Sequence, residues 1–310
     1  MRRINIGELN INQKPVKEYF SLELFGLVDG SNISLPVALI SNQDGPIVTI
    51  IAAQHGNEWN GSYVADTLYN SLILDDVVGR IIILPIANPP AFLQKGRVSS
   101  FDYIDMNRTF GFVKRRKPTE HLAKIIFEEF VLKSDYLVDL HSGGPGQYLP
   151  IVEVYNSKRI DLALSFNLDK AMVVKKDVGS IILNAEKNGV QSFSIEAGRA
   201  LKINYDYAEL LLKGLTNFLK ATGVLKSKPV VKENQTLYKG KTVVPSTISG
   251  FFKTELKLGQ KVKKGDVLAK IKPFFKSEPT EIINTTNGTV IYLRYEELIS
   301  EGESIVHIAY

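Results

Sequence analysis

IVTIIAA at residues 47–53 is a short, nearly continuous apolar run. Such runs predict strands that are buried on both faces, as in a sheet covered by helices. Two further runs share the pattern, at Arg80–Ile86 and Tyr136–Leu140. Amphipathic helical patterns lie between these runs, at Glu58–Leu74 and Thr119–Leu132. The alternation predicts an α/β domain.

The same pattern continues to about residue 225. Later strands are expected at Ala171–Val174 and Ser192–Glu196, and a helix is expected from about Tyr205 to Thr222. Residues 226–234 contain a Lys-Pro pair and show no hydrophobic periodicity, which is typical of a linker. We therefore expect one domain at residues 1–225 and a second at residues 235–310.

The second domain is predicted to be all-β because its short apolar runs are separated by glycines. A weak repeat connects Gly250 to Gly265-Asp266 and Gly288 to Gly302-Glu303, with 14 and 13 intervening residues, and each half ends in a strand-like run. Two similar halves predict a small sandwich or barrel, which resembles the biotinyl/lipoyl-like fold. Carrier domains of that fold present a modifiable lysine between their halves. Here residues 272–279, KPFFKSEP, lack the usual context, so we expect the fold without the carrier function.

Composition excludes several classes of protein. The 310 residues are 44% hydrophobic and 23% charged, the balance of an ordinary globular protein. No run of 18 apolar residues and no signal-peptide h-region is present, and cysteine is absent. The absence of cysteine removes disulfides, thiolate metal ligands and thiol nucleophiles. Together these features favour a cytoplasmic location and no membrane partner.

The net charge of +5 is unevenly distributed. Residues 1–225 hold 24 basic and 24 acidic side chains, whereas residues 226–310 hold 14 and 9. The C-terminal lysines are scattered among expected strands and do not alternate with aromatic residues in a stripe. We therefore expect no nucleic-acid partner.

Two of the four histidines follow predicted strands. His55 follows the run at 47–53 in Gln54-His-Gly-Asn-Glu58, and His141 follows the run at 136–140. Ligands of open α/β sheets bind beyond the carboxyl ends of strands, so both imidazoles should face one crevice. Glu58 lies three residues after His55, a spacing that lets both side chains reach one cation. Two histidines and one carboxylate, with a fourth position for water, form the ligand set of a catalytic zinc.

The alternative for each histidine is a structural hydrogen bond, which is the commoner role of a single histidine at a strand end. His121 and His307 are expected to be solvated, the first on an exposed helix face and the second by its alignment with Lys270 in the repeat.

A long polar loop after the strand at 80–86 carries Arg97, Asn107 and Arg108. Guanidinium groups suit the binding of a carboxylate or the stabilisation of an oxyanion. We expect Asp105 to orient the side chain of Arg108 without contacting the substrate itself. The alternative is a surface loop with ordinary ion pairs.

Farther along, Glu196 ends the strand at 192–196 and precedes Ala-Gly, so it is a candidate general base.

The order His-x-x-Glu, Asp-x-Asn-Arg, Asp-Leu-His-Ser-Gly-Gly and Glu-Ala-Gly resembles the succinylglutamate desuccinylase/aspartoacylase family, which is related to zinc carboxypeptidases. The resemblance implies a zinc-carboxypeptidase-like mixed sheet flanked by helices, and one Zn²⁺ per chain. It also implies the site residues: His55, Glu58 and His141 as zinc ligands, Glu196 as the catalytic base, Arg97 at the scissile carbonyl, and Asn107 and Arg108 at the substrate carboxylate.

Two departures from the family pattern concern loops. The segment Asp105–Gly111 lacks the proline that the family often has there, which puts the loop shape in question. Four consecutive basic residues at 114–117 make the next loop unusually basic, and we expect this loop to influence substrate preference.

The expected function is zinc-dependent hydrolysis of the amide bond of a small N-acyl amino acid or a related amine. The C-terminal domain is expected to narrow the entrance to the active site, and assembly into a homo-oligomer is compatible with the sequence. A zinc carboxypeptidase acting on peptides and a non-enzymatic binding or carrier module are the alternatives that the sequence leaves open.

Overall fold

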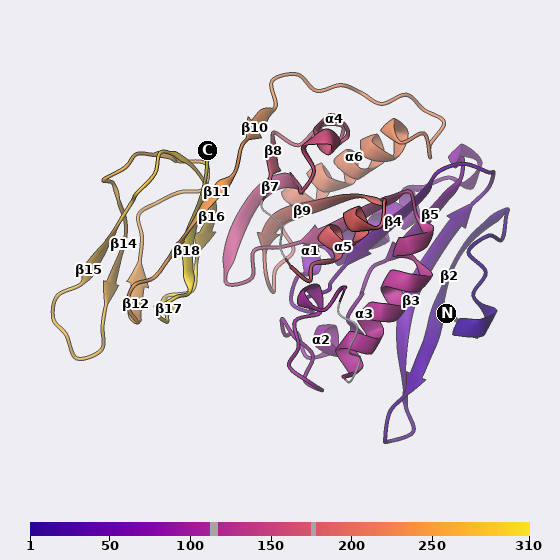
Figure 1. The fold of residues 1–310 in the computed structure, drawn as a ribbon, viewed down its shortest axis with the longest axis horizontal. Coiled ribbons are helices and arrows are strands. Elements are labelled where there is room, and N and C mark those ends of the chain that lie inside the picture. Colours follow the sequence, from indigo (N-terminus) through magenta and orange to yellow (C-terminus); the bar gives the residue numbers. More distant parts are fainter. Residues whose placement is uncertain (112–116, 175–177) are drawn as a thin grey trace.

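A computed structural model describes residues 1–111, 117–174 and 178–310 (Figure 1). The basic loop that was expected to influence substrate preference lies largely outside the described residues. Among the described residues, no helix combines the length and the apolar composition that crossing a membrane requires.

The main sheet contains both parallel and antiparallel strands. Its strands up to residue 199 are β1 (Arg2–Asn5), β2 (Val16–Gly26), β3 (Asn32–Ser41), β4 (Ile47–Ala52), β5 (Arg80–Leu84), β6 (Tyr136–His141), β7 (Gly146–Val154), β8 (Lys170–Val173) and β9 (Gln191–Arg199). At the centre, β5, β4, β6 and β9 are neighbours in that order and run parallel. Antiparallel β3 and β7 flank this group on its two sides. The mixed α/β fold is thus as expected.

Helices cover both faces of the sheet (Figure 1). They are α1 (Trp59–Ser71), α2 (Pro89–Leu93), α3 (Pro118–Glu129), α4 (Ile160–Leu164), α5 (Ile181–Lys187) and α6 (Tyr205–Ala221). Short 3₁₀ turns occur at Ile6–Glu8, Leu74–Asp76, Met106–Arg108, Val131–Lys133 and Ser157–Arg159. The predicted strands and helices of this part are confirmed, with ends that differ by up to three residues.

Side chains that alternate along the central strands build two apolar cores. In β4, Val48 and Ile50 face the core shared with α1, α4 and α6. Ile51 faces the other core, which is shared with α3, α5 and the β2–β3 hairpin. Burial on both faces explains why these strands are nearly continuous apolar runs in the sequence.

The segment between helix α6 and the C-terminal strands forms neither helix nor strand at residues 226–235. It is nevertheless anchored, because Asn217 of α6 donates to the carbonyl of Val230 at 2.8 Å and accepts from its amide at 2.7 Å. Beyond it, β10 (Thr236–Tyr238) pairs in parallel with β8.

The C-terminal strands extend the main sheet and add a second one. They are β11 (Lys241–Pro245), β12 (Gly250–Lys253), β13 (Lys261–Val262), β14 (Val267–Lys272), β15 (Thr280–Ile283), β16 (Gly288–Arg294), β17 (Leu298–Ile299) and β18 (Ser304–Ala309). The glycine repeat corresponds to β12–β14 and β16–β18. Strand β16 pairs antiparallel with β7, with Tyr292 opposite Tyr148. A continuous sheet therefore joins the two parts of the chain, while β15, β14, β12 and β17 form the outer sheet.

Phe218 lies on the buried face of α6. Its ring stacks on Phe166 at 4.3 Å between centroids and meets Phe193 edge-on at 5.1 Å, and its side chain is fully buried. We predict that Phe218→Ala lowers the free energy of unfolding by about 3–5 kcal/mol, because the cavity removes contacts on several sides. Urea denaturation measures this change. As a control, Phe275→Ala at a fully exposed position should change the value by less than about 0.5 kcal/mol. Equal effects of the two substitutions would contradict the packing described.

Candidate metal centre and active site

A tight turn between β4 and α1 positions the first two candidate ligands. Ala53 adopts a left-handed conformation (φ 51°), and the amide of Glu58 closes the turn by donating to the carbonyl of His55 at 3.1 Å. Gly56 is required for packing, since a Cβ there would lie 1.9 Å from the backbone of Ala91 in α2. The turn brings the side chains of His55 and Glu58 to the same side.

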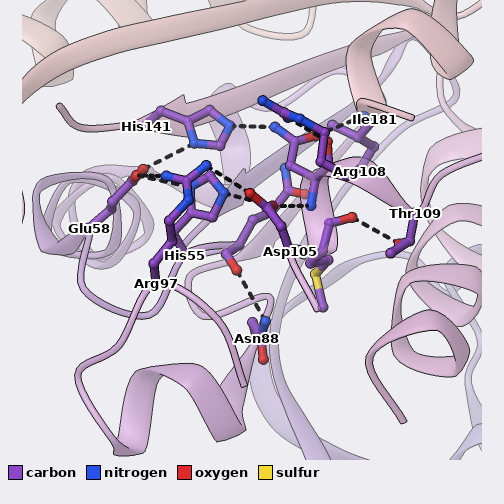
Figure 2. Close-up of polar contacts among 12 residues, drawn as sticks. His55, Glu58, Asn88, Arg97, Asp105, Arg108, Thr109, His141 and Ile181 are labelled. Atoms are coloured by element: carbon purple, nitrogen blue, oxygen red, sulfur yellow. Dashed lines mark hydrogen bonds and ion pairs between the residues drawn. The ribbon is translucent and has the colours of Figure 1, made fainter. Parts of the chain in front are cut away.

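The carboxylate of Glu58 lies between two imidazoles (Figure 2). Its Oε1 is 2.9 Å from Nδ1 of His55, and its Oε2 is 3.0 Å from Nδ1 of His141. All three side chains are buried, and their ligand atoms lie within 4.8 Å of one another. The sequence prediction that these residues meet at the ends of β4 and β6 agrees with this geometry, and the group can bind a metal ion.

The outer nitrogen of each imidazole contacts a carboxylate. His55 Nε2 lies 3.0 Å from Asp105 Oδ1, and His141 Nε2 lies 2.8 Å from Asp139 Oδ2. Gln54 donates to both oxygens of Asp139 at 2.7 Å. Histidines that bind metals commonly donate their other N–H to a carboxylate, which orients the ring and leaves the inner nitrogen as a ligand. This arrangement therefore fits a metal bound through both Nδ1 atoms and Glu58.

Charge complementarity keeps the carboxylates of the centre ionised. Burial opposes ionisation of Glu58, but the adjacent His55 and His141 outweigh it and hold the pKa of Glu58 below its ordinary value. Burial likewise opposes ionisation of Asp105, while its contacts with His55 and Arg97 lower its pKa. The centre thus offers anionic oxygen beside imidazole nitrogen, the donor set that suits Zn²⁺.

The loop after α2 delivers Arg97 to this centre. Its guanidinium donates to Asp105 Oδ2 at 2.8 Å and lies 3.6 Å from Glu58 Oε1.

The expectation that Asp105 orients Arg108 is wrong. Asp105 caps the 3₁₀ turn at 106–108 by accepting the amide of Asn107 at 3.0 Å. That conformation directs its carboxylate to His55 and Arg97.

Asn107 and Arg108 line the same cavity as the triad. Asn107 is buried, with Oδ1 accepting the amide of Ile181 at 2.9 Å and Nδ2 lying 3.2 Å from His141 Nε2. Arg108 donates from a terminal nitrogen to the carbonyl of Asn107 at 2.8 Å. The structure therefore brings the polar loop residues to the edge of the candidate metal centre.

Glu196 lies on β9 directly opposite His141 of β6. Its Oε2 is buried and has no hydrogen-bond partner among the described residues. Burial raises the pKa of Glu196 to about 8, and the negative charges of Glu58 and Glu153 add to the effect, while His141 opposes it. The backbone is closely packed two residues after Glu196, because a Cβ at Gly198 would lie 1.9 Å from Asn60 Nδ2.

The cavity has a volume of about 480 Å³ and is shared by the two parts of the chain. Strands β11, β16 and β18 supply one wall, with residues Lys241, Val243, Tyr292, Ser304 and His307. Reasoning from the sequence assigned no functional role to these residues, nor to Asp139 and Gln54. The spacing of Asp139 two residues before His141 on one strand was a usable signal, because it places both side chains on one face.

The expectation that His307 is solvated is wrong. The imidazole stacks on Tyr292 at 4.4 Å between centroids and accepts a hydrogen bond at Nδ1 from the Tyr148 hydroxyl. The alignment of His307 with Lys270 in the repeat did not predict the environment of His307. Strand β14 lies in the exposed outer sheet, whereas β18 lies beside β16 at the cavity. His121, by contrast, is exposed as expected.

Comparisons with known proteins agree on one family. The model of the succinylglutamate desuccinylase/aspartoacylase catalytic domain matches residues 44–222. An N-alpha-acetyl-L-2,4-diaminobutyric acid deacetylase from Halomonas elongata is 26% identical over 293 residues, which cover 89% of this chain and 86% of that protein.

Solved structures extend the similarity to the whole chain. The product-bound ectoine utilization protein from Ruegeria pomeroyi is 25% identical with a TM-score of 0.87, and the match covers 97% of each chain. A succinylglutamate desuccinylase from Silicibacter sp. shares the fold with a TM-score of 0.88 at 21% identity, over 98% of each chain.

The environment of His307 predicts a pH dependence of stability. Burial, reinforced by the charge of Lys241, lowers the pKa of His307 from 6.5 to about 3. The folded chain therefore keeps this imidazole neutral, whereas the unfolded chain protonates it below about pH 6.5. Stability from this group is present above about pH 6.5 and is lost as the pH falls toward 3.

We predict that His307→Asn reduces the fall in melting temperature between about pH 7 and pH 5, since asparagine does not titrate. Differential scanning calorimetry at both pH values measures the difference. The exposed His121→Asn should show the same fall as the unsubstituted protein. An unchanged fall in the His307 variant would contradict the assignment of a neutral, half-buried imidazole.

Proposed function

The chain belongs to the succinylglutamate desuccinylase/aspartoacylase family, and we propose that it is a zinc-dependent hydrolase of small N-acyl amino acids or related N-acyl amines. One observation carries the proposal: the buried His55–Glu58–His141 group lines the same cavity as Glu196, whose buried Oε2 has no hydrogen-bond partner among the described residues. The first supplies a set of metal ligands and the second a base. Together they are what metal-assisted hydrolysis of an amide requires.

His55, Glu58 and His141 would hold one Zn²⁺ through two Nδ1 atoms and a carboxylate oxygen. When bound, such an ion lowers the pKa of a water molecule and polarises a carbonyl. Asp105 and Asp139 keep the two rings in the orientation that presents Nδ1 to the ion. Their role is positioning, and it is set before any substrate arrives.

Glu196 is the proposed general base. Its carboxyl group lines the cavity that contains the candidate metal ligands, where it can accept a proton from a water molecule. It takes the proton from the attacking water and delivers it to the nitrogen of the leaving amine. Oε2, which has no hydrogen-bond partner among the described residues, is available for this transfer.

Arg97 is the proposed donor to the developing oxyanion of the scissile carbonyl. The contact with Asp105 fixes the guanidinium before the reaction, so little reorganisation is needed as charge develops. Asn107 and Arg108 are proposed to bind the substrate carboxylate, which would hold the amide in line with the water.

The C-terminal wall is proposed to limit the substrate to small molecules. Lys241, Tyr292 and His307 border the cavity that contains the triad, so a longer peptide would meet these strands. We further propose that this domain has the biotinyl/lipoyl-like fold without its carrier function. The name of the Halomonas relative makes N-acetyl amino acids, diaminobutyrate included, the first substrates to assay.

Metal content tests the ligand set. We predict that the unsubstituted protein binds one Zn²⁺ per chain and that His141→Ala loses it, because a site with two remaining ligands binds far more weakly. Inductively coupled plasma mass spectrometry after dialysis measures the stoichiometry. His121→Ala is the matched control and should retain the metal. Full occupancy in a folded His141 variant would remove that residue from the site.

The base is tested separately from the metal. Glu196→Gln should lower kcat by about 10²–10⁴-fold, because the amide cannot accept the proton of the water. Zinc content and melting temperature should stay close to those of the unsubstituted protein. Release of the free amine from N-acetyl amino acids gives the rate. Turnover that survives this substitution would exclude Glu196 as the base.

A further inference from the structure

The hydroxyl oxygen of Ser142 is buried and has no hydrogen-bond partner among the described residues. Ser142 directly follows the candidate ligand His141, is 4% exposed and lines the cavity that contains the triad. Burying a hydroxyl without a hydrogen bond is unfavourable. A bound molecule that donates to this oxygen would remove that cost.

Main-chain hydrogen bonds fix the position of Ser142. Its amide donates to Glu58 Oε2 at 2.9 Å, and the amide of Gly143 donates to the carbonyl of Gly198 at 3.0 Å. Gly198 lies two residues after Glu196. This short segment is therefore held to a candidate metal ligand by one bond and to the segment after the proposed base by the other.

The neighbouring carbonyl groups already accept hydrogen bonds. The carbonyl of Ser142 accepts the amide of Gly144 at 3.0 Å, that of Gly143 accepts the amide of Gly146 at 2.9 Å, and that of Gly144 accepts the amide of Ala200 at 3.2 Å. Within residues 142–144, the side-chain oxygen of Ser142 is the acceptor that no donor of the described chain reaches.

The roles proposed above leave one polar group of the substrate without a partner. Asn107 and Arg108 are assigned to the carboxylate, and Arg97 is assigned to the oxygen of the scissile carbonyl. The N–H of the scissile amide, which N-acyl amino acids share, has no acceptor among these residues. A donor that enters a buried site without an acceptor loses its hydrogen bond to water, which weakens binding.

We propose that Ser142 Oγ accepts a hydrogen bond from the N–H of the scissile amide, an inference that rests on the proposed hydrolase function. The hydroxyl contacts the substrate itself and orients the amide beside the triad. It also makes the site selective for amides over esters, because an ester has no hydrogen on the atom that leaves.

The same bond determines where the leaving nitrogen receives its proton. As water adds to the carbonyl carbon, the nitrogen loses its planarity and develops a lone pair. Its hydrogen stays bonded to Ser142 Oγ, so the lone pair develops on another side of the nitrogen. Glu196 delivers there the proton that it took from the water. The C–N bond then breaks, giving a carboxylic acid and an amine, and no proton moves to Ser142.

Ser142→Ala tests this role because it removes the acceptor but keeps the main-chain amide that donates to Glu58. The substrates are two matched pairs, N-acetyl-L-aspartate with O-acetyl-L-malate and N-acetyl-L-alanine with O-acetyl-L-lactate. Each pair differs only in N–H against oxygen at the scissile bond. Values of kcat/KM for the zinc-loaded, full-length protein give the amide-to-ester ratio, which the substitution should lower by about tenfold or more.

A binding measurement tests the same bond without turnover. Both members of each pair are titrated calorimetrically into Glu196→Gln, in which hydrolysis is slow. Adding Ser142→Ala to this background should raise the Kd of the amide by about tenfold relative to that of the ester. This measurement decides the question where hydrolysis of the ester is too slow to compare.

Two other serines provide matched controls. Ser62 of α1 also has a buried hydroxyl without a partner among the described residues, but it does not line the described cavity. Ser194 of β9 lines the cavity without being next to a candidate ligand in the sequence. Ser62→Ala and Ser194→Ala should leave the amide-to-ester ratio unchanged.

Zinc content and melting temperature show whether the Ser142 variant is intact. Both should stay close to those of the unsubstituted protein, because removing an unsatisfied hydroxyl leaves no group of the chain unpaired. Ser142→Gly removes the same hydroxyl and takes the place of the alanine variant if that variant does not fold.

The outcomes separate this inference from the proposed function. An unchanged amide-to-ester ratio in a folded, zinc-loaded Ser142 variant overturns the inference alone. An equal fall of the ratio in Ser194→Ala also overturns it, since the effect would then not be specific to Ser142. No hydrolysis of any amide by the unsubstituted, zinc-loaded protein overturns the proposed function and, with it, this inference.

Discussion

The position of the Glu58 carboxylate between two imidazoles is the constraint on which the site depends. Burying an anion is unfavourable unless partners compensate for lost hydration. Here Nδ1 of His55 and Nδ1 of His141 face the carboxylate, and the amide of Ser142 donates to it at 2.9 Å. Parallel β4 and β6 end at the same edge of the sheet, which places the two ring centres 5.1 Å apart. The fold thus assembles the candidate ligands directly.

Not every polar group around the triad is satisfied. Asp105 and Asp139 fix the outer nitrogens of the rings, so the ligand geometry is set in advance. Glu196, by contrast, keeps a buried oxygen without a partner among the described residues, at a cost in stability. Such local conflicts are expected where a site needs a reactive group. Asp105 and Asp139 thus orient the imidazole rings, whereas Glu196 is the residue proposed to transfer protons.

Local pattern was enough to predict the central strands and the convergence of His55, Glu58 and His141, because buried parallel strands have a distinct composition. Contacts between distant segments were not predictable in this way. The partner of Asp105 depends on the conformation of a 3₁₀ turn, and the half-buried position of His307 at the cavity depends on β16 pairing with β7. Neither feature has a periodic signal. The alignment of His307 with Lys270 gave a wrong prediction because one half of the repeat faces solvent and the other half faces the cavity.

We propose that His55, Glu58 and His141 would hold one zinc ion, through Nδ1 of each imidazole and a carboxylate oxygen. Anomalous diffraction above and below the zinc absorption edge, from crystals of the zinc-loaded protein, tests it most directly. We expect a single strong peak per chain, in contact with His55 Nδ1, His141 Nδ1 and a carboxylate oxygen of Glu58. A peak at another place, coordination through Nε2, or no peak at the triad would contradict it.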